Sequence, residues 1–377
     1  MRIGFEGKRA VQNFTGLGNY SRYVADILCH FYPENDYVLY APKKRENKRM
    51  NLLTGQYRQL TLAYPATSFW KKLSSLWRVW GITSQLEKEG IELFHGLSNE
   101  LPLNIHKSRI KSIVTIHDLI FLRYPQYYQS IDRKIYTYKF RKACENADKI
   151  IAISECTKRD ITRYFNIPDD KIEVVYQGCD VSFTHPVTEE KKEEVRKKYQ
   201  LPDHYILNVG SIEERKNILA AVQALPMLPQ HIHIVIVGRR TGYTKKVEQF
   251  IKDNGLGERV HIISNVPFND LPAFYQSAEI FVYPSRFEGF GIPIIEALYS
   301  GIPVVAATGS CLEEAGGPDS IYVNPDDITG LADAFKQIYS NSDKRKNMVE
   351  KGREFAKRFS EKQQSEEIIN IYKKLIR

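Results

Sequence analysis

The sequence predicts an α/β protein of two domains, each a parallel β-sheet covered by helices on both faces. Three observations support this prediction: a length of 377 residues, two successive series of short apolar segments, and helical periodicity between those segments. At roughly 150 residues per domain, two domains are expected. Nearly continuous apolar strands that alternate with helices are typical of parallel sheets buried on both sides. Two such series therefore predict two doubly wound domains.

The first series of elements fills the N-terminal half of the chain. We expect strands at residues 2–6, 37–40, 93–96, 112–116, 149–153 and 172–176. Apolar side chains at helical spacing between Tyr20 and Leu28 predict a helix over 19–31, and another helix is expected over 133–146. A glycine-bearing loop is expected before the helix at 19–31.

The second series repeats the pattern after residue 180. The expected strands are 205–209, 233–237, 260–262, 279–283 and 303–306. A charged, proline-containing stretch at 178–192 separates the two series, so we place the N-terminal domain at 1–182 and the C-terminal domain at 183–359. The last segment, 360–377, is expected to form a helix. Its apolar face must pack on another element and consists of Ile368, Ile369, Tyr372, Leu375 and Ile376.

Composition excludes several classes of protein. Hydrophobic residues make up 42% of the chain and charged residues 26%, which is typical of a folded protein and excludes a largely disordered one. No apolar run reaches the roughly 18–20 residues of a membrane-spanning helix, and no secretory signal is expected. The five cysteines are scattered, at positions 29, 144, 156, 179 and 311. We therefore expect a cytoplasmic protein without a disulfide framework or a zinc knuckle.

The positive charge is confined to one half of the chain. Residues 1–180 contain 28 Lys and Arg against 19 Asp and Glu, whereas residues 181–377 contain 26 of each kind, so the whole net charge of +9 lies in the first half. This polarity favours an anionic partner: nucleic acid, a phosphorylated substrate or acidic lipid headgroups. The alternative is a solvated basic surface without a partner.

The most specific motif runs from Glu288 to Glu296 and reads Glu-Gly-Phe-Gly-Ile-Pro-Ile-Ile-Glu. It follows an expected strand, and Pro293 suits the first turn of a helix. A helix N-terminus at the carboxyl edge of a parallel sheet is a common site for nucleotides and phosphates. Because carboxylates bind vicinal diols, Glu288 is suited to a sugar and Glu296 to a ribose. The alternative for Glu296 is a cap or a surface ion pair. The backbone N–H groups expected to face the ligand are those of Phe290, Gly291 and Ile292.

A second motif follows the expected strand at 205–209. It begins with Gly210 and Ser211 and continues to Arg215, Lys216 and Asn217, where a helix is expected to start. A guanidinium fork and a compact ammonium side by side suit a diphosphate. The alternative is an ordinary solvated loop.

Two weaker signals lie in the N-terminal half. His117, followed by Asp118, ends an expected strand, so its side chain either faces a cleft or is a hydrogen-bonded core histidine. Gly16 and Gly18 precede the first long helix, but the stretch is not a complete dinucleotide fingerprint. It is either a backbone loop that approaches a ligand or simply a helix start.

Taken in order, these motifs resemble those of the retaining, nucleotide-sugar-dependent glycosyltransferases of family 4, also called glycosyl transferases group 1. The resemblance rests on the E-x7-E spacing of Glu288 and Glu296, and it covers almost the whole chain. Further matches are the stretches at 16–18, 117–119, 210–217, 265–271 and 283–285. The chain departs from the family pattern at Gln177-Gly178-Cys179-Asp180, at Ser264 and over 311–318, which affects the expected base contacts and loop shape.

The resemblance implies the GT-B fold, in which two Rossmann-like domains bind the acceptor and the donor, respectively, and the last helix returns to the first domain. Arg215 and Lys216 would bind the diphosphate, with Gly210 and Ser211 in the same loop, and Glu296 would bind the ribose. His117 and Glu288 would act at the transferred sugar. The remaining implied contacts are the amides of Phe290 and Gly291 to the sugar, the helix start at Ile292 to the leaving diphosphate, Asn265 and Val266 to the base, and Gly16 and Gly18 to the phosphates.

The expected reaction transfers a hexose from a GDP- or UDP-linked sugar to a glycan or lipid-diphosphate-linked acceptor, with retention of configuration, in the synthesis of a surface polysaccharide or glycolipid. Likeness of residues 117–128 to mannosyltransferases favours mannose. The chain contains no Asp-x-Asp motif, so we expect neither a metal ion nor a cofactor. Other GT-B enzymes, such as a nucleotide-sugar epimerase or a sugar phosphate synthase, are the alternatives. A basic nucleic-acid-binding protein is disfavoured because no recognition motif is present.

All three tryptophans lie between Phe69 and Trp80, where helical spacing would place them with two leucines on one face of a single helix. Such a helix, with Lys71 and Lys72 beside it, could lie on an anionic membrane at the inner face of the cell membrane, close to a lipid-linked acceptor. Packing against the protein's own sheet would give the same pattern.

Overall fold

The computed structural model describes residues 1–376, which divide into two compact units. Of the described residues, 1–177 and 361–376 make up the first unit, and 178–360 make up the second. The last helix of the chain, α18 (Glu361–Ile376), therefore belongs to the first unit, although the chain has passed through the second unit before reaching it.

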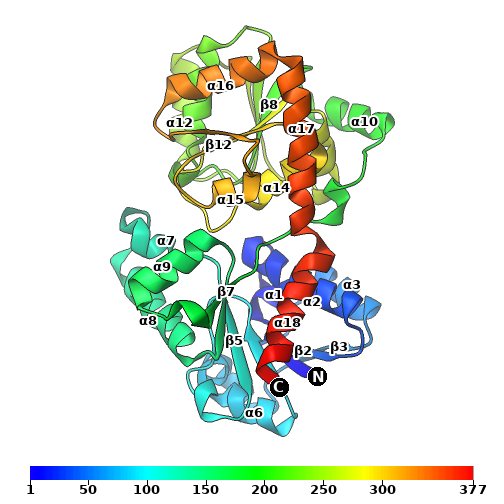
Figure 1. Ribbon diagram of the computed structural model, residues 1–377, viewed down its shortest axis with the longest axis vertical. Helices are drawn as coiled ribbons and strands as arrows, with labels where there is room; N and C mark the ends of the chain where they lie inside the picture. The colour runs from blue at the N-terminus through cyan, green and yellow to red at the C-terminus, as the bar shows by residue number, and fades with distance from the viewer. Residues whose placement is uncertain (377) are drawn as a thin grey trace. The chain divides into compact units, whose positions relative to one another are not determined.

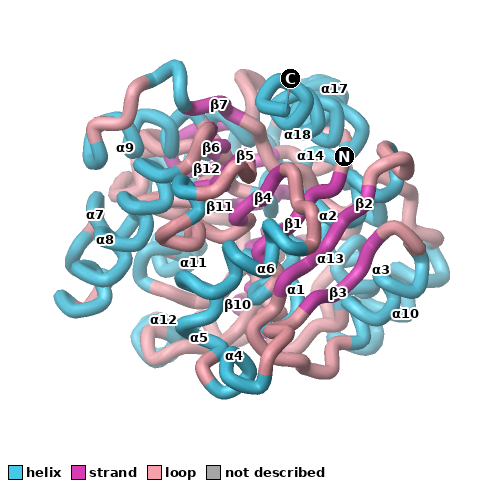
Figure 2. The backbone as a smooth tube through the Cα atoms, turned by 90° about the horizontal axis from the view of Figure 1, so that it is seen from below, coloured by secondary structure: helices cyan, strands magenta, loops and turns pink. Residues whose placement is uncertain are grey.

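The first unit is built on a seven-stranded parallel sheet in the order β3-β2-β1-β4-β5-β6-β7. The strands are β1 (Arg2–Glu6), β2 (Asp36–Tyr40), β3 (Leu60–Ala63), β4 (Leu93–Gly96), β5 (Lys111–Ile116), β6 (Lys149–Ala152) and β7 (Ile172–Val174). Figure 2 shows β3, β2, β1 and β4 side by side in this order. The sheet changes its direction of growth between β1 and β4, and loops at such a switch point commonly bind ligands.

Helices cover both faces of this sheet (Figure 1). They are α1 (Lys8–Gln12), α2 (Gly16–Phe31), α3 (Lys48–Gln56), α4 (Ser68–Lys72), α5 (Ser74–Leu76), α6 (Ile82–Lys88), α7 (Ile120–Arg123), α8 (Ser130–Asn146), α9 (Glu155–Phe165) and α18. The last helix packs along α2, and its Ile368, Ile369 and Tyr372 are buried in the same hydrophobic cluster as Val24 and Leu28. This contact accounts for the apolar face that the sequence predicts on the final helix.

The second unit contains a six-stranded parallel sheet in the order β10-β9-β8-β11-β12-β13. The strands are β8 (Tyr205–Val209), β9 (His233–Val237), β10 (Val260–Ile263), β11 (Ile280–Tyr283), β12 (Val304–Ala307) and β13 (Ile321–Val323). The helices are α10 (Glu189–Tyr199), α11 (Ile218–Ala224), α12 (Thr244–Asp253), α13 (Leu271–Gln276), α14 (Ile292–Ser300), α15 (Leu312–Gly316), α16 (Ile328–Ser340) and α17 (Ser342–Ala356). The switch point of this sheet lies between β8 and β11.

The structure corrects three expectations about local structure. Strands β3 and β13 were not predicted: they lie at sheet edges, have only four and three residues, and are largely half-buried, so they lack the long buried run that marks the central strands. Helix α2 begins at Gly16, so Gly16 and Gly18 form its first turn rather than a loop. The tryptophan segment is not one helix: it consists of α4, α5 and a π-helical turn over Trp77–Gly81 that leads into α6.

The break in the tryptophan segment separates the environments of its aromatic side chains. Trp77 is completely buried and donates a hydrogen bond from Nε1 to Oε1 of Gln85 at 3.1 Å. Phe69 is 62% exposed and Trp80 is 48% exposed. The single tryptophan face predicted for a regular helix is therefore divided between the core and the surface.

Candidate active site

The two strongest motifs meet at the switch point of the second sheet. Strand β8 leads into Gly210 and the short turn Glu214–Lys216, and β11 leads into the loop that carries Glu288. At a switch point, the connections that follow two adjacent parallel strands run to opposite faces of the sheet. The loops at the carboxyl ends of those two strands commonly form a ligand site. The order of the strands therefore brings together side chains that are more than seventy residues apart in sequence.

Gly210 and Gly238 allow two backbone segments to approach each other closely at this switch point. Gly210 has a φ of +153°, and a Cβ added to Gly238 would lie 1.8 Å from the carbonyl oxygen of Gly210. Asn217 has a left-handed backbone (φ +54°) and uses its side-chain amide to donate to the carbonyl oxygens of Pro284 (3.3 Å) and Pro325 (2.7 Å). It therefore ties the β8 loop to the β11 loop and does not form the side-chain helix cap that the sequence predicts.

Glu288 lies at the centre of a buried cluster of charges. Its Oε2 is 2.8 Å from Nη1 of Arg215, and its Oε1 is 3.1 Å from Nζ of Lys216. The hydroxyl groups of Ser285 (2.8 Å) and Tyr283 (3.1 Å) also donate to Oε1. The two cations lower the pKa of Glu288 to about 2 in spite of its burial, and in return Glu288 raises the pKa of both Arg215 and Lys216.

The second carboxylate of the motif has a different environment. Gly291 (φ +130°) begins helix α14, Pro293 lies in its first turn, and Glu296 lies one turn further on. Glu296 accepts a hydrogen bond from the hydroxyl of Tyr275 at 2.6 Å, but no cation in the described part of the chain pairs with it, and burial raises its pKa to about 7. In the first turn of α14, Pro293 has no N–H and the N–H of Ile294 donates to the carbonyl oxygen of Gly291 at 2.9 Å, so the N–H of Ile292 is the one that can face an anion.

Cys311, which was not predicted as a site residue, contacts the loop between Glu288 and Glu296. The Sγ atom of Cys311 lies 3.0 Å from the carbonyl oxygen of Glu288 and 2.9 Å from that of Phe290. Phe290 itself is buried against Phe359, with 5.5 Å between the ring centroids. The only signal in the sequence was the departure from the family pattern that starts at residue 311.

Ser211, Asn265 and Val266 do not join the charged cluster. Ser211 donates to Oε1 of Glu213 at 2.6 Å and so orders the loop after β8. Asn265, with a φ of +59°, and Val266 follow the edge strand β10, which is separated from β8 by β9. The side chain of Glu288 is thus in direct contact with Arg215 and Lys216, and Glu296 follows on α14. Asn265 and Val266, which are expected to contact the base, lie further along the edge of the sheet.

His117, Gly16 and Gly18 belong to the first unit. His117 ends β5 and is only 6% exposed. Its Nε2 donates to the carbonyl oxygen of Leu97 (2.9 Å), and its Nδ1 accepts from the amide of Gln177 (3.3 Å). Burial lowers its pKa to about 4, so the ring is neutral at pH 7. Of the two interpretations of this residue, the hydrogen-bonded core histidine describes the arrangement in the structure.

A buried network of polar side chains next to His117 was not predicted. His95 on β4 contacts the hydroxyl of Tyr372 through Nδ1 (2.6 Å) and Oγ1 of Thr115 through Nε2 (2.8 Å). Thr115 lies 3.3 Å from the hydroxyl of Tyr20, whose ring packs edge-on against His117 with 4.6 Å between the centroids. The returning helix α18 is therefore joined to the core of the first unit by polar contacts as well as apolar ones.

Gly18 is required by a close approach of two segments in the first unit. A Cβ at this position would lie 2.0 Å from the carbonyl oxygen of Asn13, whereas one at Gly16 would meet nothing within 4 Å. The glycine at 18 therefore allows α2 to start directly against the end of α1.

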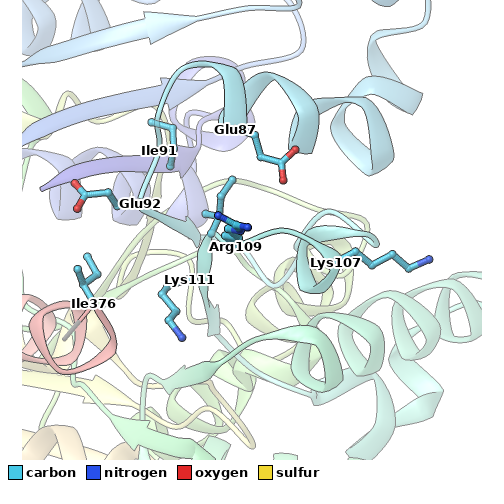
Figure 3. A pocket seen from close by; sticks show the side chains of 8 residues that line it. Glu87, Ile91, Glu92, Lys107, Arg109, Lys111 and Ile376 are labelled. Atoms are coloured by element: carbon cyan, nitrogen blue, oxygen red, sulfur yellow. The ribbon is translucent and has the colours of Figure 1, made fainter.

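A hollow of about 630 Å³ in the first unit lies away from these residues (Figure 3). It is lined by Glu87, Ile91, Glu92, Lys107, Arg109, Ile110, Lys111 and Ile376. Glu92 and Lys111 mark the beginnings of β4 and β5, so the hollow is at the amino ends of the strands and His117 is at the carboxyl end of β5. Within residues 1–376 no helix is long and apolar enough to cross a membrane, and no group of His, Cys, Asp and Glu side chains is arranged to bind a metal ion.

Two doubly wound parallel-sheet units, with the last helix returned to the first unit, define the GT-B class. Family models agree: residues 189–355 match Glycosyl transferases group 1 and residues 21–183 match Glycosyltransferase Family 4. The chain is 30% identical to O-antigen chain mannosyltransferase B of Escherichia coli over 289 residues, which cover 75% of this chain and 74% of that protein. The chain therefore belongs to the family 4 glycosyltransferases, the glycosyl transferases group 1.

A further relative and two solved structures match at lower identity. O-antigen chain mannosyltransferase RfbU of Salmonella typhimurium is 29% identical over 225 residues, 60% of each chain. The sucrose-phosphate synthase of Thermosynechococcus elongatus has a TM-score of 0.78 at 20% identity and covers 100% of this chain and 99% of that chain. Anabaena HepE in complex with UDP and glucose has a TM-score of 0.77 at 18% identity, with each chain fully covered. These solved structures confirm the fold.

Proposed function

We propose that this glycosyltransferase moves a hexose, with mannose as the first candidate, from a nucleotide-diphosphate sugar to a glycan or lipid-diphosphate-linked acceptor in surface polysaccharide or glycolipid synthesis. The observation that carries the proposal is the contact of Arg215 and Lys216 with Glu288 at the switch point of the second sheet. The mannosyltransferases among its relatives support the sugar, and the UDP bound to Anabaena HepE supports a nucleotide donor. A cytoplasmic location follows from the need for such a donor.

In the proposed reaction the bond between the anomeric carbon and the diphosphate breaks, and the acceptor hydroxyl forms its new bond on the same face of the sugar. The proton of that hydroxyl passes to the leaving phosphate, so configuration is retained. Arg215, Lys216 and the N-terminus of α14 would stabilise the charge that develops on the diphosphate. Two cations from the chain suit a transfer that needs neither a metal ion nor a cofactor.

Thermal stability in the presence of UDP, GDP, ADP and their sugars tests the donor site. A ligand at 100 times its Kd should stabilise the protein by about 2.7 kcal/mol. Turnover of the donor should then require a separate acceptor, persist in EDTA, and give a product whose anomeric configuration matches that of the donor by NMR. Donor turnover without an acceptor would instead indicate an epimerase or a hydrolase.

We further propose that the first unit contacts an anionic membrane through the segment from Phe69 to Trp80. Its exposed apolar side chains are Phe69, Leu73, Leu76 and Trp80, and Lys71 and Lys72 are exposed beside them. Aromatic side chains with flanking lysines are typical of segments that lie at the headgroup level of a bilayer. Such contact would bring the enzyme close to a lipid-linked acceptor.

Co-sedimentation with vesicles that contain anionic lipid tests this contact. Binding should decrease with salt and with the double substitution Phe69→Ser and Trp80→Ser. Leu52→Ser is the matched control, because Leu52 is 74% exposed in the same unit but lies outside the segment. Equal loss of binding in the control, or no loss in the double variant, would contradict the proposal. Trp77 is unsuitable for this test because it is buried in the core.

A further inference from the structure

The carboxylate of Glu288 has little acceptor capacity left for a substrate in the observed arrangement. Each oxygen of an ionised carboxylate has about two lone-pair sites. Three donors, from Lys216, Tyr283 and Ser285, surround Oε1, and Arg215 alone contacts Oε2. One lone pair is therefore left, on Oε2, and a pair of sugar hydroxyls can bind this oxygen only after Arg215 has moved.

The side chains of Arg215 and Lys216 both form ion pairs with Glu288. Arg215 and Lys216 are 15% and 17% exposed at their side chains, and Glu288 is 13% exposed, so the ion pairs are largely shielded from water. At such distances, away from bulk water, opposite charges interact strongly. A diphosphate that binds these cations must compete with the Glu288 carboxylate for them.

We propose that Glu288 and the donor diphosphate exchange places as partners of Arg215 and Lys216, and that this exchange couples recognition of the diphosphate to recognition of the sugar. The proposal rests on the proposed function. When a nucleotide sugar binds, the diphosphate takes the two cations, and the lone pairs released on Glu288 accept hydroxyl groups of the sugar. Ser285 keeps the carboxylate in place through its hydrogen bond to Oε1, and Tyr283, whose hydroxyl also accepts from Nζ of Lys216 at 2.8 Å, can still donate to the same oxygen.

The same exchange assists release of the nucleotide product. After transfer the sugar has left Glu288, whose freed lone pairs again require donors. The nearest are Arg215 and Lys216, so the carboxylate competes with the diphosphate that remains. An intact nucleotide sugar satisfies both the cations and the carboxylate, whereas a free nucleoside diphosphate leaves Oε2 of Glu288 without the donor that Arg215 supplies. Glu288 thus favours the donor over the product at one site.

The substitution Glu288→Gln separates this exchange from a purely structural ion pair. The amide is the same size but no longer competes for the cations, so inorganic pyrophosphate, UDP or GDP should bind about tenfold more tightly by isothermal titration calorimetry. Donor turnover should fall, and inhibition by the nucleoside diphosphate should become stronger. Glu213→Gln is the matched control: it removes the same charge near Arg215, but its carboxylate is 3.7 Å away and more exposed.

The possible outcomes distinguish the inference from the function on which it rests. Failure of the wild type to bind pyrophosphate, UDP or GDP would overturn the proposed function, and the exchange with it. Binding by the wild type, with equal or weaker binding by Glu288→Gln, would overturn the exchange alone, as would an equal gain in Glu213→Gln. Circular dichroism checks that the variant is folded. If it is not, Glu288→Ala removes the same carboxylate and is expected to give the same tightening.

Discussion

Replacing Glu296 by glutamine tests whether this buried carboxyl group is kept for binding at the expense of stability. The side chain lies half-buried on α14, accepts a hydrogen bond from the hydroxyl of Tyr275 at 2.6 Å, and is paired with no cation among residues 1–376. Burial disfavours the charged form and raises the pKa to about 7. A glutamine has nearly the same shape, still accepts from Tyr275, and carries no charge at any pH.

The sign and size of the effect follow from proton linkage. Between pH 4.5 and 7 the folded protein holds a proton that the unfolded chain has released, so the stability of the wild type falls as the pH rises through this window. A pKa raised from 4.5 to about 7 corresponds to a total of about 3 kcal/mol, fully lost above pH 7. Glu296→Gln does not undergo this loss. Its stability relative to the wild type should therefore increase by about 2–3 kcal/mol between pH 5 and pH 8.

Urea unfolding at pH 5 and pH 8 measures this difference, with Glu350→Gln, at an exposed position on α17, as the control. The same variant should bind UDP or GDP at least tenfold more weakly at pH 8, because it lacks the carboxylate that we expect to accept both ribose hydroxyls. A stability difference that does not change with pH would refute the argument from burial. Unchanged nucleotide affinity would refute the assignment to the ribose.

Two other substitutions test the packing around the proposed sites. Gly238→Ala should greatly weaken nucleotide binding measured by calorimetry. The added Cβ would collide with the carbonyl of Gly210 and displace the loop that carries Arg215 and Lys216. Gly242→Ala should not weaken binding, because a Cβ there would meet nothing within 4 Å. Tyr372→Phe should lower the free energy of unfolding by about 1–3 kcal/mol in urea, because the buried Nδ1 of His95 loses its hydrogen-bond partner, whereas exposed Tyr138→Phe should have almost no effect. Equal stability of the two tyrosine variants would contradict the network.

Much of the fold could be predicted because each buried strand is a short, continuous apolar segment of the sequence. The predictions at residues 2–6, 205–209 and 233–237 coincide with β1, β8 and β9, since nearly every side chain of these strands faces apolar surroundings. The tryptophan segment could not be predicted in the same way. Its apolar side chains fit one face of a regular helix, but a break at Leu73 and a π-helical turn at Trp77 change the direction of the faces.

In the candidate site, likewise, the residues could be selected from the sequence but the contacts between them could not. Glu288, Arg215 and Lys216 could be selected from their motifs, and their proximity could be expected from parallel strands whose carboxyl ends share an edge. Their mutual pairing could not, because the direction of each side chain depends on loops shaped by Gly210 and Asn217. The polar contacts of Cys311 and Tyr372 were not predicted, since a lone cysteine and a tyrosine on the apolar face of a helix have no local signature for such contacts.

By itself, the sequence determined the kind of molecule this is: alternating strands and helices, two domains, and acidic and basic motifs placed where strands end. These properties depend on periodicity and residue type within short windows, which a linear chain displays directly. Only the tertiary structure decided that one carboxylate of the E-x7-E motif is ionised between two cations while the other is buried without any. The pKa of a side chain is set by the charges and solvent around it, and folding brings those neighbours from distant parts of the chain.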